Sequence, residues 1–124
     1  MSHSLQPFLE VSVTDSTKIK SRDIIELLPP GWKTQFEEVI VGIESVLDVD
    51  IIGVDIRDGV LYLTMSPSQL TNVTLTNYVL KTLAQQSAQT CMVCGKYARR
   101  RKEQAHKPAL CRTHYLEYIN ALED

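Results

Sequence analysis

The sequence of 124 residues has few of the features that mark membrane proteins or secreted proteins. No apolar run approaches the roughly 18 residues that a membrane-spanning helix needs, so we predict no membrane segment. The first residues are not a basic segment followed by an apolar block, and we therefore expect no signal peptide. Only three cysteines are present, and all belong to one motif, which leaves none for a disulfide and favours a cytoplasmic location.

Motifs typical of enzymes are also missing. The chain has no Gly-rich phosphate-binding loop and no Ser/His/Asp grouping. A zinc deaminase needs a His-x-Glu sequence ahead of its cysteine pair, and none precedes Cys91. We therefore predict that the protein is not an enzyme, and we keep a metal-dependent nuclease or deaminase as an alternative.

Charge is distributed unevenly along the chain, although the formal net charge is only −2. Residues 1–90 hold 6 Lys or Arg and 11 Asp or Glu, whereas residues 91–124 hold 7 and 4. The acidic part and the basic part are therefore expected to face different partners. Hydrophobic residues make up 44% of the chain, which is enough for one domain with a modest core.

The cysteines and one histidine follow the spacing Cys-x2-Cys-x16-Cys-x2-His, formed by Cys91, Cys94, Cys111 and His114. Two ligand pairs separated by a short connector are typical of a tetrahedral zinc site. Gly95 directly follows the first pair and lets the chain turn back with a positive φ. We predict one structural Zn²⁺, because four ligands at this spacing leave no open coordination position for catalysis.

Two alternatives to this ligand set stay open. The three cysteines can be buried free thiols that cluster by chance, or His106 can replace His114 as the fourth ligand. The second alternative makes the spacing less regular and removes the metal anchor from the helix that follows. That helix is indicated by apolar residues at i, i+3, i+4 and i+7, which are Tyr115, Tyr118, Ile119 and Leu122.

A basic connector, residues 96–107, lies between the ligand pairs and holds six Lys or Arg against one Glu. Its cations can contact nucleic-acid phosphates or carboxylates of a partner protein, or can keep a loop tip soluble. The candidate contact residues are Lys96, Arg99, Arg100, Arg101, Lys102, Lys107 and Arg112. Because Arg112 is the only basic residue of the C-terminal helix, we do not expect sequence-specific reading of DNA. Tyr97 and Leu110 are expected to shield the metal from water.

The first part of the chain predicts a strand and a short helix. Residues 8–13 alternate apolar and polar side chains, as a half-buried strand does. Residues 21–28 indicate a helix that Ser21 caps and that Pro29-Pro30-Gly31 ends.

A β-hairpin between two helices forms the predicted body. The helix at residues 33–48 begins with a Thr34-x-x-Glu37 capping box and carries an apolar stripe that should pack on the hairpin. The hairpin, residues 50–65, turns at Asp58-Gly59, a two-residue turn signature. In that register the facing apolar pairs are Ile56 with Leu61, Val54 with Leu63, and Ile52 with Met65.

A last body helix is predicted for residues 69–87, with apolar residues on two sides. One side suits the hairpin, and the other suits the N-terminal segment, the zinc module, a partner protein or a second copy of the chain. No Gly or Pro separates this helix from Cys91, so it should lead directly into the metal motif.

The predicted fold class is α+β. It comprises an N-terminal segment at residues 1–30, a helix–β-hairpin–helix body at 31–90, and a treble-clef-like zinc finger at 91–124 that packs on the body. A structural zinc can supply most of the folding free energy of so small a finger.

The motifs within residues 31–115 resemble those of a set of small bacterial and phage proteins. The resemblance is carried by Gly31-Trp32 before a helix, the hairpin, a helix that ends near Ser87, and the Cys-x2-Cys-Gly and Leu-Cys-x2-His motifs. The finger alone is similar to that of the DksA/TraR regulators of RNA polymerase, which usually have a fourth cysteine and a long coiled coil with an acidic tip. This chain has His114 and no such coil, so their mechanism is not transferred. The resemblance implies zinc ligation by Cys91, Cys94, Cys111 and His114 and implies no reaction.

We therefore predict a non-enzymatic, zinc-binding regulatory or adaptor protein that acts by binding a partner protein. The acidic body, the wide apolar surface of helix 69–87 and the lack of a catalytic set favour this interpretation. The alternative is a nucleic-acid-binding protein that contacts phosphates through the basic connector. Helix 69–87 also offers a surface for self-association.

Overall fold

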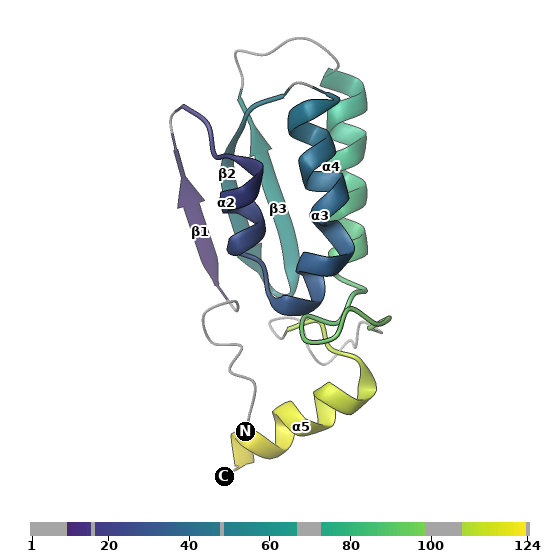
Figure 1. Ribbon diagram of the computed structural model, residues 1–124. Helices are drawn as coiled ribbons and strands as arrows, with labels where there is room; N and C mark the ends of the chain where they lie inside the picture. The colour runs from purple at the N-terminus through teal and green to yellow at the C-terminus, as the bar shows by residue number, and fades with distance from the viewer. Residues whose placement is uncertain (1–9, 16, 48, 67–72, 99–107, 124) are drawn as a thin grey trace.

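A computed structural model shows α2 and α3 in front of a three-stranded sheet, with α4 beside α3 (Figure 1). It describes residues 10–15, 17–47, 49–66, 73–98 and 108–123. In chain order the elements are β1 (Val11–Thr14), α2 (Ser21–Glu26), α3 (Pro30–Ser45), β2 (Ile51–Arg57), β3 (Val60–Met65), α4 (Val73–Ser87) and α5 (Arg112–Glu123). The predicted α+β class is confirmed. None of the helices in these ranges is long and apolar enough to cross a membrane.

The sheet is antiparallel and has the strand order β1-β2-β3. Because β1 pairs with β2, residues from the predicted N-terminal segment form an edge strand of the same sheet as the hairpin. Side chains alternate along β3: Leu61 and Leu63 are buried, whereas Tyr62 and Thr64 are exposed. Since one face of the sheet is buried, a slip of one residue would turn the apolar side chains to water.

The hairpin turns at Asp58-Gly59, as predicted. Both residues have positive φ values, 54° and 75°, which a two-residue turn of this kind requires. Two of the predicted cross-strand pairs are confirmed, namely Val54 with Leu63 and Ile56 with Leu61.

The third predicted pair is wrong, because Met65 pairs with Ile51 and not with Ile52. The register shifts between Ile51 and Gly53, where β2 contains one extra residue. Such a bulge changes the face to which the preceding residues point. As a result Ile51, only 4% exposed, lies in the core.

α2 begins in a different way from the predicted one. Lys20 occupies the N-cap position, and no side-chain hydrogen bond caps the helix, so the prediction that Ser21 caps it is wrong. Glu44 of α3 instead accepts a hydrogen bond from the backbone N–H of Ser21 at 2.9 Å. A carboxylate is favourable at the positive end of a helix, and here it also joins α2 to α3.

α3 begins and ends three residues earlier than predicted. Pro30 does not terminate a helix but occupies a first-turn position of α3, where its missing N–H costs no hydrogen bond. The capping box at Thr34 is therefore wrong, since Thr34 lies inside the helix and its hydroxyl is 3.4 Å from the carbonyl oxygen of Gly31. The buried side of α3 consists of Gly31, Trp32, Phe36, Ile40 and Ile43.

One hydrophobic core contains residues of the sheet, of α2, α3 and α4, and of the Cys/His segment. α4 contributes the buried Leu83 and the partly buried Val79 and Leu80. Near its end, Ser87 accepts a hydrogen bond from the backbone N–H of Leu61 at 2.8 Å, which fastens α4 to the edge of β3. The predicted helix residues 69–72 lie outside the described ranges.

Candidate metal centre

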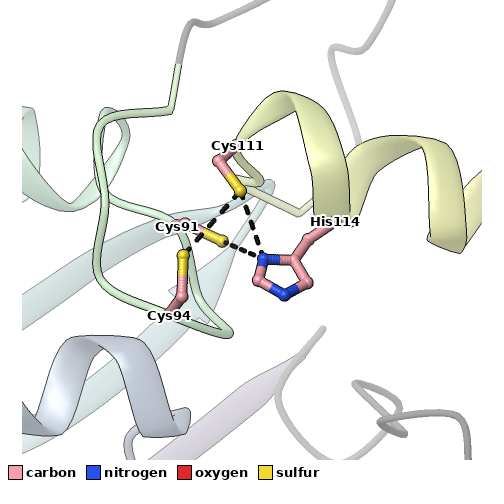
Figure 2. Close-up of side chains that lie close together, drawn as sticks. All are labelled: Cys91, Cys94, Cys111 and His114. Carbon is pink, nitrogen blue, oxygen red and sulfur yellow. Dashed lines mark hydrogen bonds between the residues drawn. The ribbon is translucent and has the colours of Figure 1, made fainter.

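Cys91, Cys94, Cys111 and His114 converge at one point, as predicted (Figure 2). Each offers one ligand atom, and these four atoms all lie within 4.8 Å of one another. Nδ1 of His114 lies 3.1 Å from Sγ of Cys111 and 3.4 Å from Sγ of Cys91, and Sγ of Cys94 lies 3.8 Å from Sγ of Cys111. The cluster can therefore hold one metal ion.

The three cysteines are free thiols. The separation of 3.8 Å between Sγ of Cys94 and Sγ of Cys111 is far longer than the S–S bond of a disulfide, about 2.05 Å. His106, the alternative fourth ligand, lies outside the described residues, so that alternative stays a prediction.

The first ligand pair lies on a tight turn, residues 91–95, which we call the metal-binding turn. The N–H of Gly95 donates to the carbonyl of Cys91 at 2.9 Å, and the N–H of Cys91 donates to the carbonyl of Lys96 at 2.7 Å. Gly95 has a φ of 81°, which confirms the predicted left-handed turn. Beyond the turn, Thr90 and Tyr97 form an antiparallel bridge. Both cysteine sulfurs therefore lie on the turn that connects this short antiparallel pairing.

The second ligand pair lies at the start of α5, beyond the end of the body at which α4 finishes (Figure 1). The N–H of Tyr115 donates to the carbonyl of Cys111 at 2.8 Å, so Cys111 occupies the N-cap position. His114 follows in the first turn, on the same side of the helix as Cys111. The N–H of Met92 donates to the carbonyl of Ala109 at 2.8 Å, and this bond holds the two ligand pairs together.

The surroundings of the cysteines change the acidity of two thiols. Burial raises the pKa of the Cys91 thiol, but backbone N–H groups of Cys111, Cys94 and Val93 point at its sulfur and bring the pKa down to about 7. Partial desolvation and the nearby sulfurs of Cys91 and Cys111 raise the pKa of the Cys94 thiol. Several thiolates this close repel one another, so a cation is the electrostatic complement of the cluster.

Burial around the cluster is uneven. Cys91 is fully buried and Cys111 is partly buried, whereas Cys94 is exposed. Leu110 is buried in the core, but Tyr97 is 70% exposed, so the prediction that Tyr97 shields the metal is wrong. The cluster therefore has one side in the core and one side open to solvent.

The metal-binding turn packs on the N-terminus of α3. The N–H of Gly31 donates to the carbonyl of Met92 at 2.7 Å, and Nε1–H of Trp32 donates to the carbonyl of Thr90 at 2.9 Å. A Cβ at Gly31 would lie 2.1 Å from the carbonyl oxygen of Cys91, so no side chain fits there. The only signals for this contact in the sequence are a glycine at a helix start and the single tryptophan beside it.

Two of the seven predicted contact cations lie in the described residues. Lys96 follows the metal-binding turn and Arg112 begins α5, and both side chains are exposed. The cations outside the described residues are Arg99, Arg100, Arg101, Lys102 and Lys107.

No family model matches the chain, and neither a curated protein nor a solved structure is significantly similar to it.

Proposed function

We propose that the protein is a non-enzymatic, zinc-binding regulatory or adaptor protein that acts by binding another protein. The observation that carries the proposal is the closed set of four ligands. Ligands at about 2.3 Å (sulfur) and about 2.1 Å (nitrogen) around one tetrahedral zinc lie about 3.6–3.8 Å apart. Of the six separations among the four ligand atoms, the S–S distance of 3.8 Å falls in that range, the S–N distances of 3.1 and 3.4 Å are shorter, and all six are within 4.8 Å.

The chemistry of the ligand atoms supports zinc over other biological cations. Thiolate and imidazole ligands suit zinc, whereas calcium and magnesium prefer oxygen ligands. Since the protein supplies all four ligands, no coordination position is left for a substrate, which favours a structural over a catalytic role. Three thiolate ligands also fit a reducing compartment such as the cytoplasm.

The proposed finger is of the treble-clef kind. The metal-binding turn supplies the knuckle, and the first turn of α5 supplies the second ligand pair. The hydrogen bonds of Gly31 and Trp32 support a finger that packs directly on the body.

The proposed partner surface is the exposed side of α4. Leu75 and Tyr78 lie one helical turn apart and are 50% and 68% exposed, although the opposite side of the helix is in the core. Neighbouring aromatic and aliphatic side chains that face solvent are typical of protein interfaces. The finger places another exposed aromatic residue, Tyr97, on the surface.

A metal analysis of the purified protein tests the zinc proposal. We expect about one zinc per chain, and the Cys94→Ser variant should lose most of it because three ligands bind zinc far more weakly than four. Cys94 is exposed, so this change leaves no cavity in the core. Thr113→Ala is the matched control, because Thr113 is exposed and lies between the ligands Cys111 and His114. Full zinc content in Cys94→Ser would contradict the assignment.

A pull-down with and without nuclease separates the protein partner from the alternative, contact with nucleic-acid phosphates through the basic connector. Protein capture that survives nuclease and is lost in Tyr78→Ala supports the proposed surface. Val46→Ala is the control, since Val46 is 79% exposed and lies outside α4. Capture that nuclease abolishes supports the nucleic-acid alternative, for which filter binding should weaken steeply with salt.

A further inference from the structure

The N-terminus of α3 contacts the metal-binding turn through Gly31. We propose that Gly31 is a positioning residue of the metal site and that it couples metal binding to the packing of α3 in the body. This inference rests on the proposed zinc binding and adds a way in which the metal regulates the rest of the molecule.

Steric contact is the first argument. A Cβ at Gly31 would lie 2.1 Å from the oxygen of Cys91, 2.5 Å from the nitrogen of Gly95 and 2.9 Å from the nitrogen of Cys94. All three are backbone atoms of the turn that carries the first two ligands. A side chain at Gly31 therefore cannot be accommodated by a rotamer change and must move α3 away from the turn or displace the sulfurs.

Gly95 closes the same contact from the other side. A Cβ there would lie 2.9 Å from the carbonyl oxygen of Gly31, and the φ of Gly95 is itself in the left-handed region. Two glycines thus let the backbones of α3 and of the metal-binding turn touch directly.

Hydrogen bonding is the second argument. The carbonyl of Met92 accepts from the N–H of Gly31 at 2.7 Å, and the N–H of Met92 donates to the carbonyl of Ala109 at 2.8 Å. Met92 is fully buried and lies between the two cysteines of the turn. A single residue therefore connects α3, the first ligand pair and the segment that leads to the second pair.

Trp32 carries the contact into the core. Its side chain is fully buried, packs edge-to-face on Phe36 with ring centroids 6.2 Å apart, and donates its indole N–H to Thr90, the residue before Cys91. If the turn loosens when the metal leaves, the indole loses its acceptor and its packing changes. Because Trp32 is the only tryptophan, its fluorescence reports this event without a label.

Coupling between binding and packing works in both directions. If zinc favours the packed position of α3, then the packed position must favour zinc by the same factor. A substitution that disturbs only the α3 contact should consequently weaken zinc binding, although it removes no ligand.

Gly31→Ala and Gly42→Ala form a matched pair for the test. Both residues lie in α3, but a Cβ at Gly42 has nothing within 4 Å. Zinc affinity is measured in the full chain by competition with a chromophoric chelator. We expect Gly31→Ala to bind zinc about tenfold or more weakly, while Gly42→Ala stays within about twofold of the wild type, since alanine favours a helix at both sites.

Wild-type Trp32 emission during zinc removal is the second measurement. We expect a red shift that follows the loss of zinc and is reversed when zinc is added back. Steady emission during removal of bound zinc, or equal affinity of the two alanine variants, overturns the coupling but leaves zinc binding intact. If Gly31→Ala does not fold, the wild-type emission decides alone. A wild-type protein that binds no zinc would refute the proposed function, and the coupling with it.

Discussion

The indole N–H of Trp32 donates a hydrogen bond of 2.9 Å to the carbonyl of Thr90, a residue 58 positions later in the chain. The bond joins the first turn of α3 to the residue that precedes the ligand Cys91. It makes a core tryptophan part of the surroundings of the metal centre.

Trp32→Phe is expected to destabilise the protein by about 2–4 kcal/mol, because it leaves the carbonyl of Thr90 without its partner and opens space in the core. Unfolding by urea, followed by circular dichroism at fixed zinc concentration, measures the change. Tyr78→Phe is the control, since Tyr78 is 68% exposed and should change stability by less than about 0.5 kcal/mol. A similar effect of both substitutions would contradict the role of the indole bond.

Removal of the metal should lower the stability of the whole body and not of the finger alone. Cys91, Met92 and Leu110 share one core with Leu61 and Leu83 of the body. Zinc at 100 times its Kd should stabilise the folded chain by about 2.7 kcal/mol if it binds only that state.

Thermal melts with and without chelator test this expectation. One transition that shifts to lower temperature with chelator supports a shared core. A separate early transition, with the main one unmoved, would show that the finger unfolds independently. Chelator should have little further effect on Cys94→Ser, which serves as the control.

Features set by neighbouring residues could be predicted from the sequence. The Cys-x2-Cys and Cys-x2-His spacings identified the four residues of the cluster, and Asp58-Gly59 identified the hairpin turn. In both cases the local geometry of a few residues determines the structure, with little influence from the rest of the chain.

Features that depend on distant residues were missed. Ser21 is a favourable N-cap residue, but the carboxylate of Glu44 from another helix takes over the N-terminus of α2. The bulge at Ile52 places Ile51 in the core, and the local sequence does not show which of the two adjacent isoleucines is buried. The local signals at Gly31, a helix start and the neighbouring tryptophan, do not reveal why glycine is required, because the requirement comes from a turn that lies about sixty residues further along the chain.

Ser87→Ala is expected to cost about 1–3 kcal/mol, since it leaves the buried N–H of Leu61 without an acceptor. Ser45→Ala provides the control: Ser87 donates its hydroxyl to the carbonyl of Ala84 in its own helix, and Ser45 does the same to Val41 but is exposed. Alanine at that position should change stability by less than about 0.5 kcal/mol. The difference between the two variants, measured by urea unfolding, isolates the bond between α4 and β3. Equal stabilities would mean that water replaces the serine.

His114 should bind zinc through Nδ1 and keep its proton on Nε2. Nδ1 is the ring nitrogen that lies 3.1 Å and 3.4 Å from two cysteine sulfurs (Figure 2). When one imidazole nitrogen binds a metal, the other keeps the proton and is a fixed donor.

Long-range ¹H–¹⁵N spectra of the zinc-loaded protein distinguish the two ring nitrogens of each histidine. We expect His114 to show metal at Nδ1 and a proton on Nε2 when zinc is bound, and to lose that pattern when a chelator removes the zinc. The signals of the other two histidines, His3 and His106, are recorded in the same sample and show whether either responds to zinc removal. A metal-bound pattern for His106, with none for His114, would transfer the fourth ligand to the connector and would remove the metal anchor from α5.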